Sequence, residues 1–143
     1  MSVLTKYQES RDLPLGHYDR IRAEKALEKE YALCHENAYR WLHMASRKGR
    51  KTYFSLKEAA NLAGELCRKV GSPVIKKVYI RSNVVPEGAA ACYSCGEIHF
   101  RGSCIPLGIL IHELTHHISK SSSHGKYFVE TQDILFQVYF GKI

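Results

Sequence analysis

The sequence predicts one α+β domain, in which four helices pack with a small three-stranded sheet. Three observations favour this class. The 143 residues are a usual length for one domain, two long segments repeat apolar residues at helical spacing, and a central segment holds β-branched residues between turn signals. No stretch approaches the roughly 18–20 apolar residues of a membrane span, so we expect no membrane contact.

The first predicted helix covers residues 19–46. Residues 1–18 before it show no periodicity and are expected to form a flexible arm, so that the domain spans residues 19–143. Within 19–46 the apolar side chains recur at steps of three and four, which indicates one face of a long helix. This face consists of Leu27, Tyr31, Cys34, Ala38, Trp41 and Ala45.

The second predicted helix begins at a capping box. Ser55 and Glu58 have the spacing at which a hydroxyl and a carboxylate satisfy the free N–H groups of a helix start. Gly71 and Pro73 are typical of a helix end. The buried face is expected to hold Leu56, Ala59, Ala60, Ala63, Leu66, Cys67 and Val70.

Residues 74–81 are rich in Val and Ile and predict a strand. Residues 89–93 and 97–100 follow as two further strands, joined by a Ser-Cys-Gly turn. Alternation along the second of them places Ile98 and Phe100 on one face. The segment is therefore expected to form a hairpin.

The same hairpin segment offers four candidate zinc ligands, which are Cys92, Cys95, His99 and Cys104. Their order resembles a retroviral-type zinc knuckle, which would make the chain a nucleic-acid-binding zinc protein. The spacing from Cys95 to His99 is one residue short for such a knuckle. The hairpin is the favoured interpretation, and the knuckle remains the alternative from a different functional class.

Two helices complete the chain. Pro106 suits a first helical turn, and the apolar run after it predicts a buried helix. A last helix is expected over residues 125–140. Its apolar side is predicted to hold Phe128, Ile134, Leu135, Val138 and Tyr139.

The formal net charge of +7 and the basic run at residues 47–51 favour polyanionic partners, so nucleic acid is a candidate ligand of this surface. Five cysteines, an odd number, fit free thiols in a reducing compartment better than a disulfide framework. The N-terminal residues carry no apolar run typical of a signal peptide. We therefore expect a cytoplasmic monomer.

The strongest chemical signal is His112-Glu113-Leu114-Thr115-His116, an HExxH motif. On a helix, residues four apart share one face, so His112 and His116 are able to bind one metal ion. Zinc lowers the pKa of a bound water to about 7. Glu113 is then placed to accept the proton of that water as a general base.

A zinc site of this kind needs a third protein ligand. His124 is the favoured candidate, because the Ser-rich segment before it and Gly125 after it allow the chain to turn back from the helix end. Glu130 and Asp133 are the alternatives, since carboxylates also bind zinc. A carboxylate third ligand would favour a regulator-cleaving protease of the kind found beside phage repressors.

Residues 112–128, HELTHHISKSSSHGKYF, resemble the SprT-like and WLM metallopeptidases, where HExxH is followed by a loop, a His-Gly or His-Asn pair and an aromatic residue. The chain is also similar to small uncharacterised actinobacterial and phage HExxH metallohydrolases. These resemblances imply a zincin-like fold with His112, His116 and His124 as zinc ligands. They also imply a sheet whose edge strand runs beside the active-site helix, a place that residues 97–100 would fill.

The sequence thus predicts a zinc-dependent metallohydrolase that acts on a peptide or protein substrate. A non-peptide amide hydrolase would share the whole site. The group that stabilises the transition state is not identified by any motif. Tyr127, Tyr93 and His99 are candidates by their location alone.

Overall fold

The computed structural model describes the backbone of residues 17–141 and the side chains of residue 25 and residues 28–141. The predicted arm lies outside the described residues except for its last two positions, which already belong to a helix. The elements, in chain order, are α2 (His17–Arg47), β1 (Tyr53–Phe54), α3 (Leu56–Lys69), β2 (Lys77–Ile80), the 3-10 helix η1 (Ser82–Val84), β3 (Ala91–Ser94), β4 (Glu97–Phe100), β5 (Ile105–Pro106), α4 (Leu107–Ser119) and α5 (Lys126–Tyr139).

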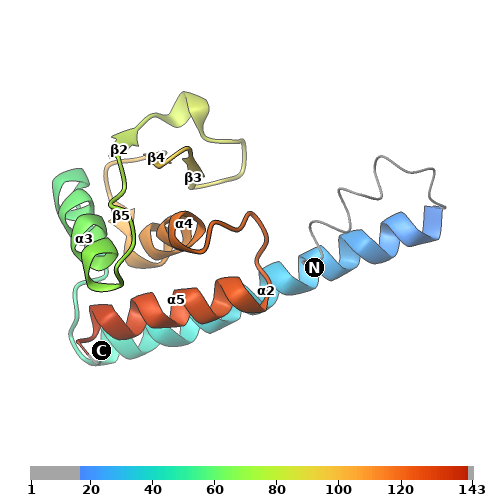
Figure 1. Cartoon of the computed structure of the whole chain (residues 1–143), viewed down its shortest axis with the longest axis horizontal. Coiled ribbons are helices and arrows are strands. Elements are labelled where there is room, and N and C mark those ends of the chain that lie inside the picture. Colours follow the sequence, from blue (N-terminus) through green and yellow to red (C-terminus); the bar gives the residue numbers. More distant parts are fainter. Residues whose placement is uncertain (1–16, 142–143) are drawn as a thin grey trace.

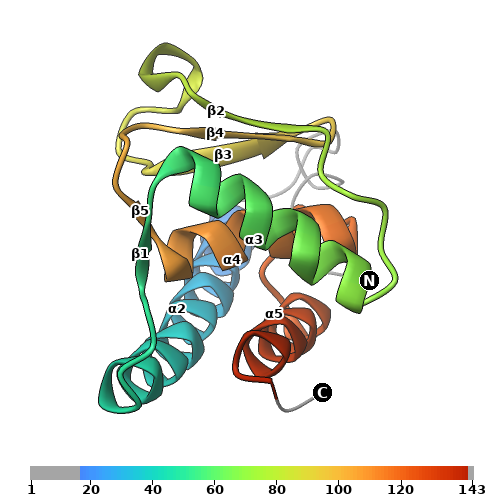
Figure 2. The same cartoon turned by 90° about the vertical axis from the view of Figure 1, so that its left-hand side faces the viewer.

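These elements confirm the predicted mixed α+β class, with four α-helices within residues 17–141. The three-stranded sheet lies on one side, α3 and α4 lie below it, and α2 and α5 run side by side on the far side (Figures 1 and 2). Helix α4 contacts α2, α3, α5, β3 and β5. The HExxH helix is therefore the central element of the fold.

The sheet has the strand order β2-β4-β3. Strand β4 pairs parallel with β2 and antiparallel with β3. The edge strand beside α4 is therefore β3, and the expectation that residues 97–100 would form this edge is wrong. The cause lies in a segment distant in the sequence: β2 pairs with the side of β4 that faces away from β3, which makes β4 the central strand.

The predicted hairpin is confirmed. Ser94 pairs with Glu97, and the two residues between them have positive φ, +48° at Cys95 and +84° at Gly96. Two positive φ angles in a two-residue loop are typical of the tight hairpin turn whose twist matches that of the strands. This turn places Cys95 at an exposed tip.

A second, two-stranded ribbon joins β1 and β5, with Tyr53 opposite Pro106. Pro106 is extended, with ψ 142°, and occupies the N-cap of α4 instead of its first turn. The sequence expectation placed the helix start one residue too early, because pairing with β1 holds Pro106 in the strand. The backbone N–H of Leu107 donates to the carbonyl of Thr52, which fixes the start of α4.

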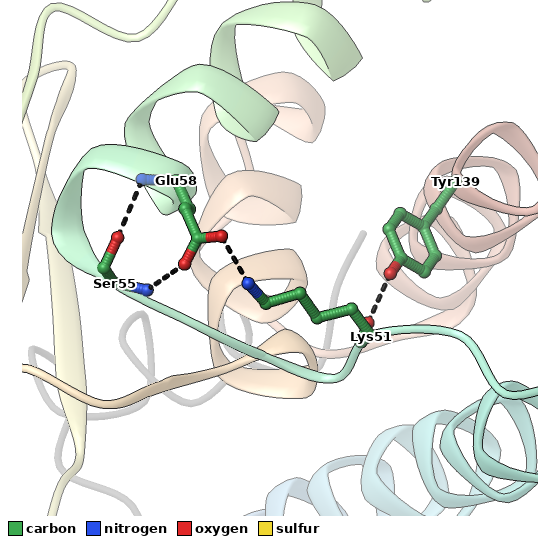
Figure 3. A network of polar contacts seen from close by, with 4 residues as sticks. All are labelled: Lys51, Ser55, Glu58 and Tyr139. Carbon is green, nitrogen blue, oxygen red and sulfur yellow. Dashed lines mark hydrogen bonds and ion pairs between the residues drawn. The ribbon is translucent and has the colours of Figure 1, made fainter.

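The capping box of α3 is present as predicted (Figure 3). The Glu58 N–H donates to Ser55 Oγ at 3.2 Å, and the Ser55 N–H donates back to the Glu58 carboxylate at 3.0 Å. Cys67 and Cys34 are fully buried, as expected of core cysteines. The largest fully buried apolar side chains are Phe100, Phe128, Phe136, Leu66, Ile98, Ile105, Leu107, Leu110, Ile111, Leu114 and Leu135.

Two predicted core positions are exposed. Ile134 on α5 is 45% exposed, because the buried side of this helix includes the polar Thr131 and Gln132 instead. Tyr31 on α2 is 47% exposed and faces the histidines of α4. The side chain of Leu27 lies outside the described residues.

Candidate metal centre

Helix α4 and the chain that follows it bring three imidazoles to one point. His112 and His116 lie one turn apart on α4, and Lys120 ends the helix in the left-handed conformation, with φ +55°. The chain then turns back through a serine segment, in which Ser121 Oγ accepts from the Ser123 N–H. This return places His124 beside the two helical histidines, immediately before α5.

The three rings form a nearly equilateral triangle, with all centroid distances equal to 5.0 Å. One ligand atom from each of His112, His116 and His124 lies within 4.8 Å of the other two. Among residues 17–141, this is the only group of three or more side chains with a spacing that could hold a metal ion.

The spacing fits a small tetrahedral ion. Zinc–nitrogen bonds of about 2.0–2.1 Å at tetrahedral angles place two imidazole nitrogens about 3.3–3.4 Å apart. His124 Nε2 and His112 Nε2 are 3.2 Å apart. Two ring nitrogens that face each other at this distance suit two lone pairs directed at one cation.

His116 is oriented by the loop. Its Nδ1 lies 2.7 Å from the carbonyl oxygen of Ser121, which accepts a hydrogen bond when Nδ1 carries the proton. That tautomer leaves Nε2 free to bind a metal. The serine loop therefore both returns the chain and sets the ligand atom of His116.

Phe128 covers one side of the triangle. The centroid of its ring lies 5.1 Å from that of His112, 4.8 Å from that of His116 and 5.0 Å from that of His124. Phe128 is fully buried, so this side of the triangle is closed to water. A ligand must therefore approach from the opposite side.

Burial keeps the three imidazoles neutral at pH 7. Burial and then the neighbouring imidazoles lower the pKa of His112 to about 3. The same two causes lower the pKa of His124 to about 4, and burial also lowers the pKa of His116. A neutral imidazole keeps the lone pair that metal binding requires.

Glu113 is buried beside the triangle, with 7% of its surface exposed. Burial raises the pKa of its carboxyl to about 7. The residue lines two adjoining cavities, of about 500 Å³ and about 610 Å³. A carboxylate at this position is accessible to a small molecule at the triangle but lies in a poorly solvated environment.

Tyr31 and His35, one turn apart on α2, lie over the open side of the triangle. The Tyr31 ring is 4.8 Å from that of His124, and the His35 ring stacks on His112 at 5.7 Å. The sequence analysis placed Tyr31 in the core and did not single out His35. Their i, i+4 spacing was the available signal, but nothing in the sequence linked α2 to the HExxH motif.

Of the three predicted candidates for transition-state contacts, only Tyr93 lines a cavity beside the triangle. Tyr93 lines the larger cavity, yet its hydroxyl is 2.9 Å from His117 Nδ1 and accepts from the Gly96 N–H. His99 is buried against the Tyr79 ring, and Tyr127 is 62% exposed at the start of α5. Neither lines the cavities beside the triangle.

The alternative third ligands have other partners. Asp133 accepts hydrogen bonds from Asn37 and from the indole N–H of Trp41, at 2.7 Å for the latter. Glu130 lies 3.9 Å from Lys126 on the exposed side of α5. Of the three candidates, the structure brings only His124 to His112 and His116.

The proposed knuckle residues do not converge. Cys92 and His99 are cross-strand neighbours on β3 and β4, Cys95 lies in the turn, and Cys104 is exposed beyond β4. They form no cluster with metal-binding spacing within the described part of the chain. The hairpin brings Cys92 and His99 opposite each other but places Cys95 in the turn, so no third ligand joins them.

Three basic side chains of the run at residues 47–51 contact other parts of the protein. Lys48 and Arg50 lie over the Phe140 ring, and the Arg50 guanidinium also donates to the carbonyl of Tyr139. Lys51 pairs with Glu58, which extends the capping box (Figure 3). These contacts attach the end of α2 to α3 and α5. Nucleic-acid binding by this run stays a prediction.

None of the helices described within residues 17–141 has both the length and the apolar character needed to cross a membrane. Comparison of the chain with protein-family models, curated proteins and solved structures found no match.

Proposed function

We propose that this protein is a zinc-dependent hydrolase that cleaves peptide bonds. One observation carries the proposal: three neutral imidazoles converge at 5.0 Å ring spacing, and the carboxylate of Glu113 lies next to them at the junction of two cavities. Three histidines with an open fourth position are the ligand set of catalytic zinc sites.

His112, His116 and His124 would hold the ion. Zinc in such a setting lowers the pKa of a bound water to about 7 and polarises a carbonyl oxygen. Three imidazoles carry no negative charge, so the site keeps the full positive charge of the ion. That charge favours Lewis-acid chemistry.

Glu113 supplies the proton transfers. Its carboxylate accepts a proton from the water whose oxygen attacks the peptide carbonyl carbon. It donates that proton to the amine nitrogen as the C–N bond breaks. Glu113 neighbours His112 in sequence and lines both cavities, but it is not part of the convergent group of ligand atoms, which fits a base and not a fourth ligand.

Tyr31 and His35 are the groups best placed to stabilise the charge that develops on the carbonyl oxygen. Both come from α2 and face the triangle on the side opposite Phe128. Tyr31 lines both cavities together with His112 and Glu113. A hydroxyl or imidazole N–H donor aimed at a developing oxyanion is a common source of rate enhancement.

The edge of β3 favours a peptide over other amides. Within residues 17–141, β3 pairs only with β4, and its residues Ala91, Cys92 and Tyr93 line the cavity that also holds His116 and Glu113. An extended peptide can pair with such an edge as an added strand. A small non-peptide amide would gain nothing from it.

The test is zinc-dependent cleavage of a peptide library by the full chain. Protein stripped with a chelator should be inactive, one equivalent of zinc should restore cleavage, and Glu113→Gln should bind zinc without cleaving. Cleavage of small amides but not of peptides would replace the proposed substrate. Failure to bind zinc would overturn the proposal.

A further inference from the structure

We propose that the protein selects substrates with an apolar side chain next to the scissile bond, and that the cavity between α2 and α4 receives this side chain. This inference rests on the proposed peptidase function and names its substrate class. It comes from the difference between the two cavities that meet at the histidine triangle.

The two cavities are continuous at the catalytic groups. Four residues line both of them, namely Tyr31, Ala91, His112 and Glu113. A chain that pairs with the edge of β3 in the larger cavity therefore passes directly into the mouth of the smaller one. The bond at Glu113 would lie between the two.

The smaller cavity, of about 500 Å³, has a mainly apolar lining, with Ser46, Thr52 and Gln132 among its polar residues. Ala38 and Leu42 line it from α2, and Pro106, Leu107 and Ile109 line it from the start of α4. Among the described residues that line it, Glu113 is the only Asp, Glu, Lys or Arg. Its volume lies within the usual range for small-ligand sites of about 300–1,000 Å³.

The larger cavity has a more polar lining. The larger cavity is lined by Lys120, Ser121 and Ser122, which follow α4, and by the edge strand β3. A charged ammonium and hydroxyls do not favour an apolar side chain. The expected preference is therefore confined to one side of the scissile bond.

Close packing at the base of the cavity fixes its shape. A Cβ atom at Gly108 would lie 2.8 Å from Leu42 Cδ1, so α2 and α4 approach each other as closely as a glycine allows. Ala38, one turn before Leu42, is small and partly buried on the same wall. A larger or charged residue at position 38 should therefore change what the cavity accepts.

The size of the preference follows from apolar burial. Burial of a leucine or phenylalanine side chain in such a cavity favours cleavage by about 10- to 100-fold over a small or charged residue. We expect peptides with Leu, Met, Phe or Tyr at one position beside the scissile bond to dominate the cleaved products of a proteome-derived library, as read by mass spectrometry.

Ala38→Asp should remove this preference and favour Lys or Arg at the same position. Ala32→Asp is the matched control, because Ala32 is exposed on the same helix and lines neither cavity. Ala38→Leu is the milder variant, which should shift the preference toward smaller side chains. Zinc content and helical circular dichroism establish that each variant is folded.

Binding gives a second readout without turnover. Zinc-loaded Glu113→Gln should bind leucine hydroxamate at least 10-fold more tightly than aspartate hydroxamate, a difference that adding Ala38→Asp should abolish. Zinc-dependent cleavage with no apolar preference would overturn this inference and leave the peptidase intact. Equal binding of the two hydroxamates would also overturn it. Selective binding without any cleavage would instead overturn the peptidase and keep the cavity assignment.

Discussion

Residues 92–104 and 112–124 are two segments of equal length that are both rich in metal-binding side chains. In the second segment three of these side chains meet at one point. In the first, no three of Cys92, Cys95, His99 and Cys104 come within metal-binding distance of one another. The same density of candidate ligands thus gives, among the described residues, a group that could hold a metal ion in one segment and no such group in the other.

Backbone geometry explains the difference. The helix places His112 and His116 on one face, and a left-handed residue at its end returns the chain so that His124 joins them. In the hairpin, a turn with two positive φ angles places Cys95 at an exposed tip, while Cys92 and His99 pair across the strands. Ligand content in a sequence therefore indicates a site only when the predicted backbone makes the ligands converge.

The largest expected effect tests this comparison directly. His124→Ala removes one of the three proposed ligands. Loss of a residue that only hydrogen-bonds to a metal ligand already costs up to roughly 100-fold in metal affinity. We therefore expect zinc affinity to fall by more than that. Cys95→Ser should leave zinc content unchanged. Zinc per chain in the two variants is measured by elemental mass spectrometry after loading and dialysis. The reverse pattern would assign the metal to the hairpin.

Glu113→Gln should have the next largest effect. The amide keeps the shape of the side chain but accepts no proton, so peptide cleavage should fall by about 10²- to 10⁴-fold, the range for loss of a general base. Zinc content should match that of the unmodified protein. If zinc is lost along with activity, Glu113 belongs to the ligand set of segment 112–124 and is not its base.

Several local features of the fold could be predicted from the sequence alone. The capping box at Ser55, the HExxH helix and the hairpin turn all depend on neighbours within a few residues, and the structure has each of them. Local signals succeed here because the hydrogen bonds that define these features close over short loops.

The long-range features could not be read in the same way. Nothing near Glu97 indicates that β2 would pair with β4 and leave β3 at the edge. Nothing near Tyr31 indicates that α2 would lie across the open side of the triangle, because the two segments are about eighty residues apart. Such contacts depend on the packing of whole elements, which residue periodicity does not encode.

Tyr31→Phe tests whether this long-range contribution matters to the site. Loss of the hydroxyl should lower kcat by about 10²-fold, the lower end of the range for removal of one oxyanion donor, with little change in KM. Tyr127→Phe is the matched control, since Tyr127 is 62% exposed and lines neither cavity. Equal effects of the two variants would limit the catalytic centre to segment 112–124 alone.

The smallest expected effect concerns the hairpin segment. Cys95 has φ +48° in front of Gly96 at +84°, a conformation that costs most L-residues about 1–2 kcal/mol. Asparagine tolerates it, and Asn-Gly is the preferred sequence for this turn. Cys95→Asn should therefore raise the free energy of unfolding by about 0.5–1 kcal/mol, measured by urea denaturation in the presence of a chelator. Cys104→Asn, the same substitution at an exposed cysteine outside the turn, should change nothing. If both variants instead lower zinc content, residues 92–104 hold a metal and the contrast between the two segments is wrong.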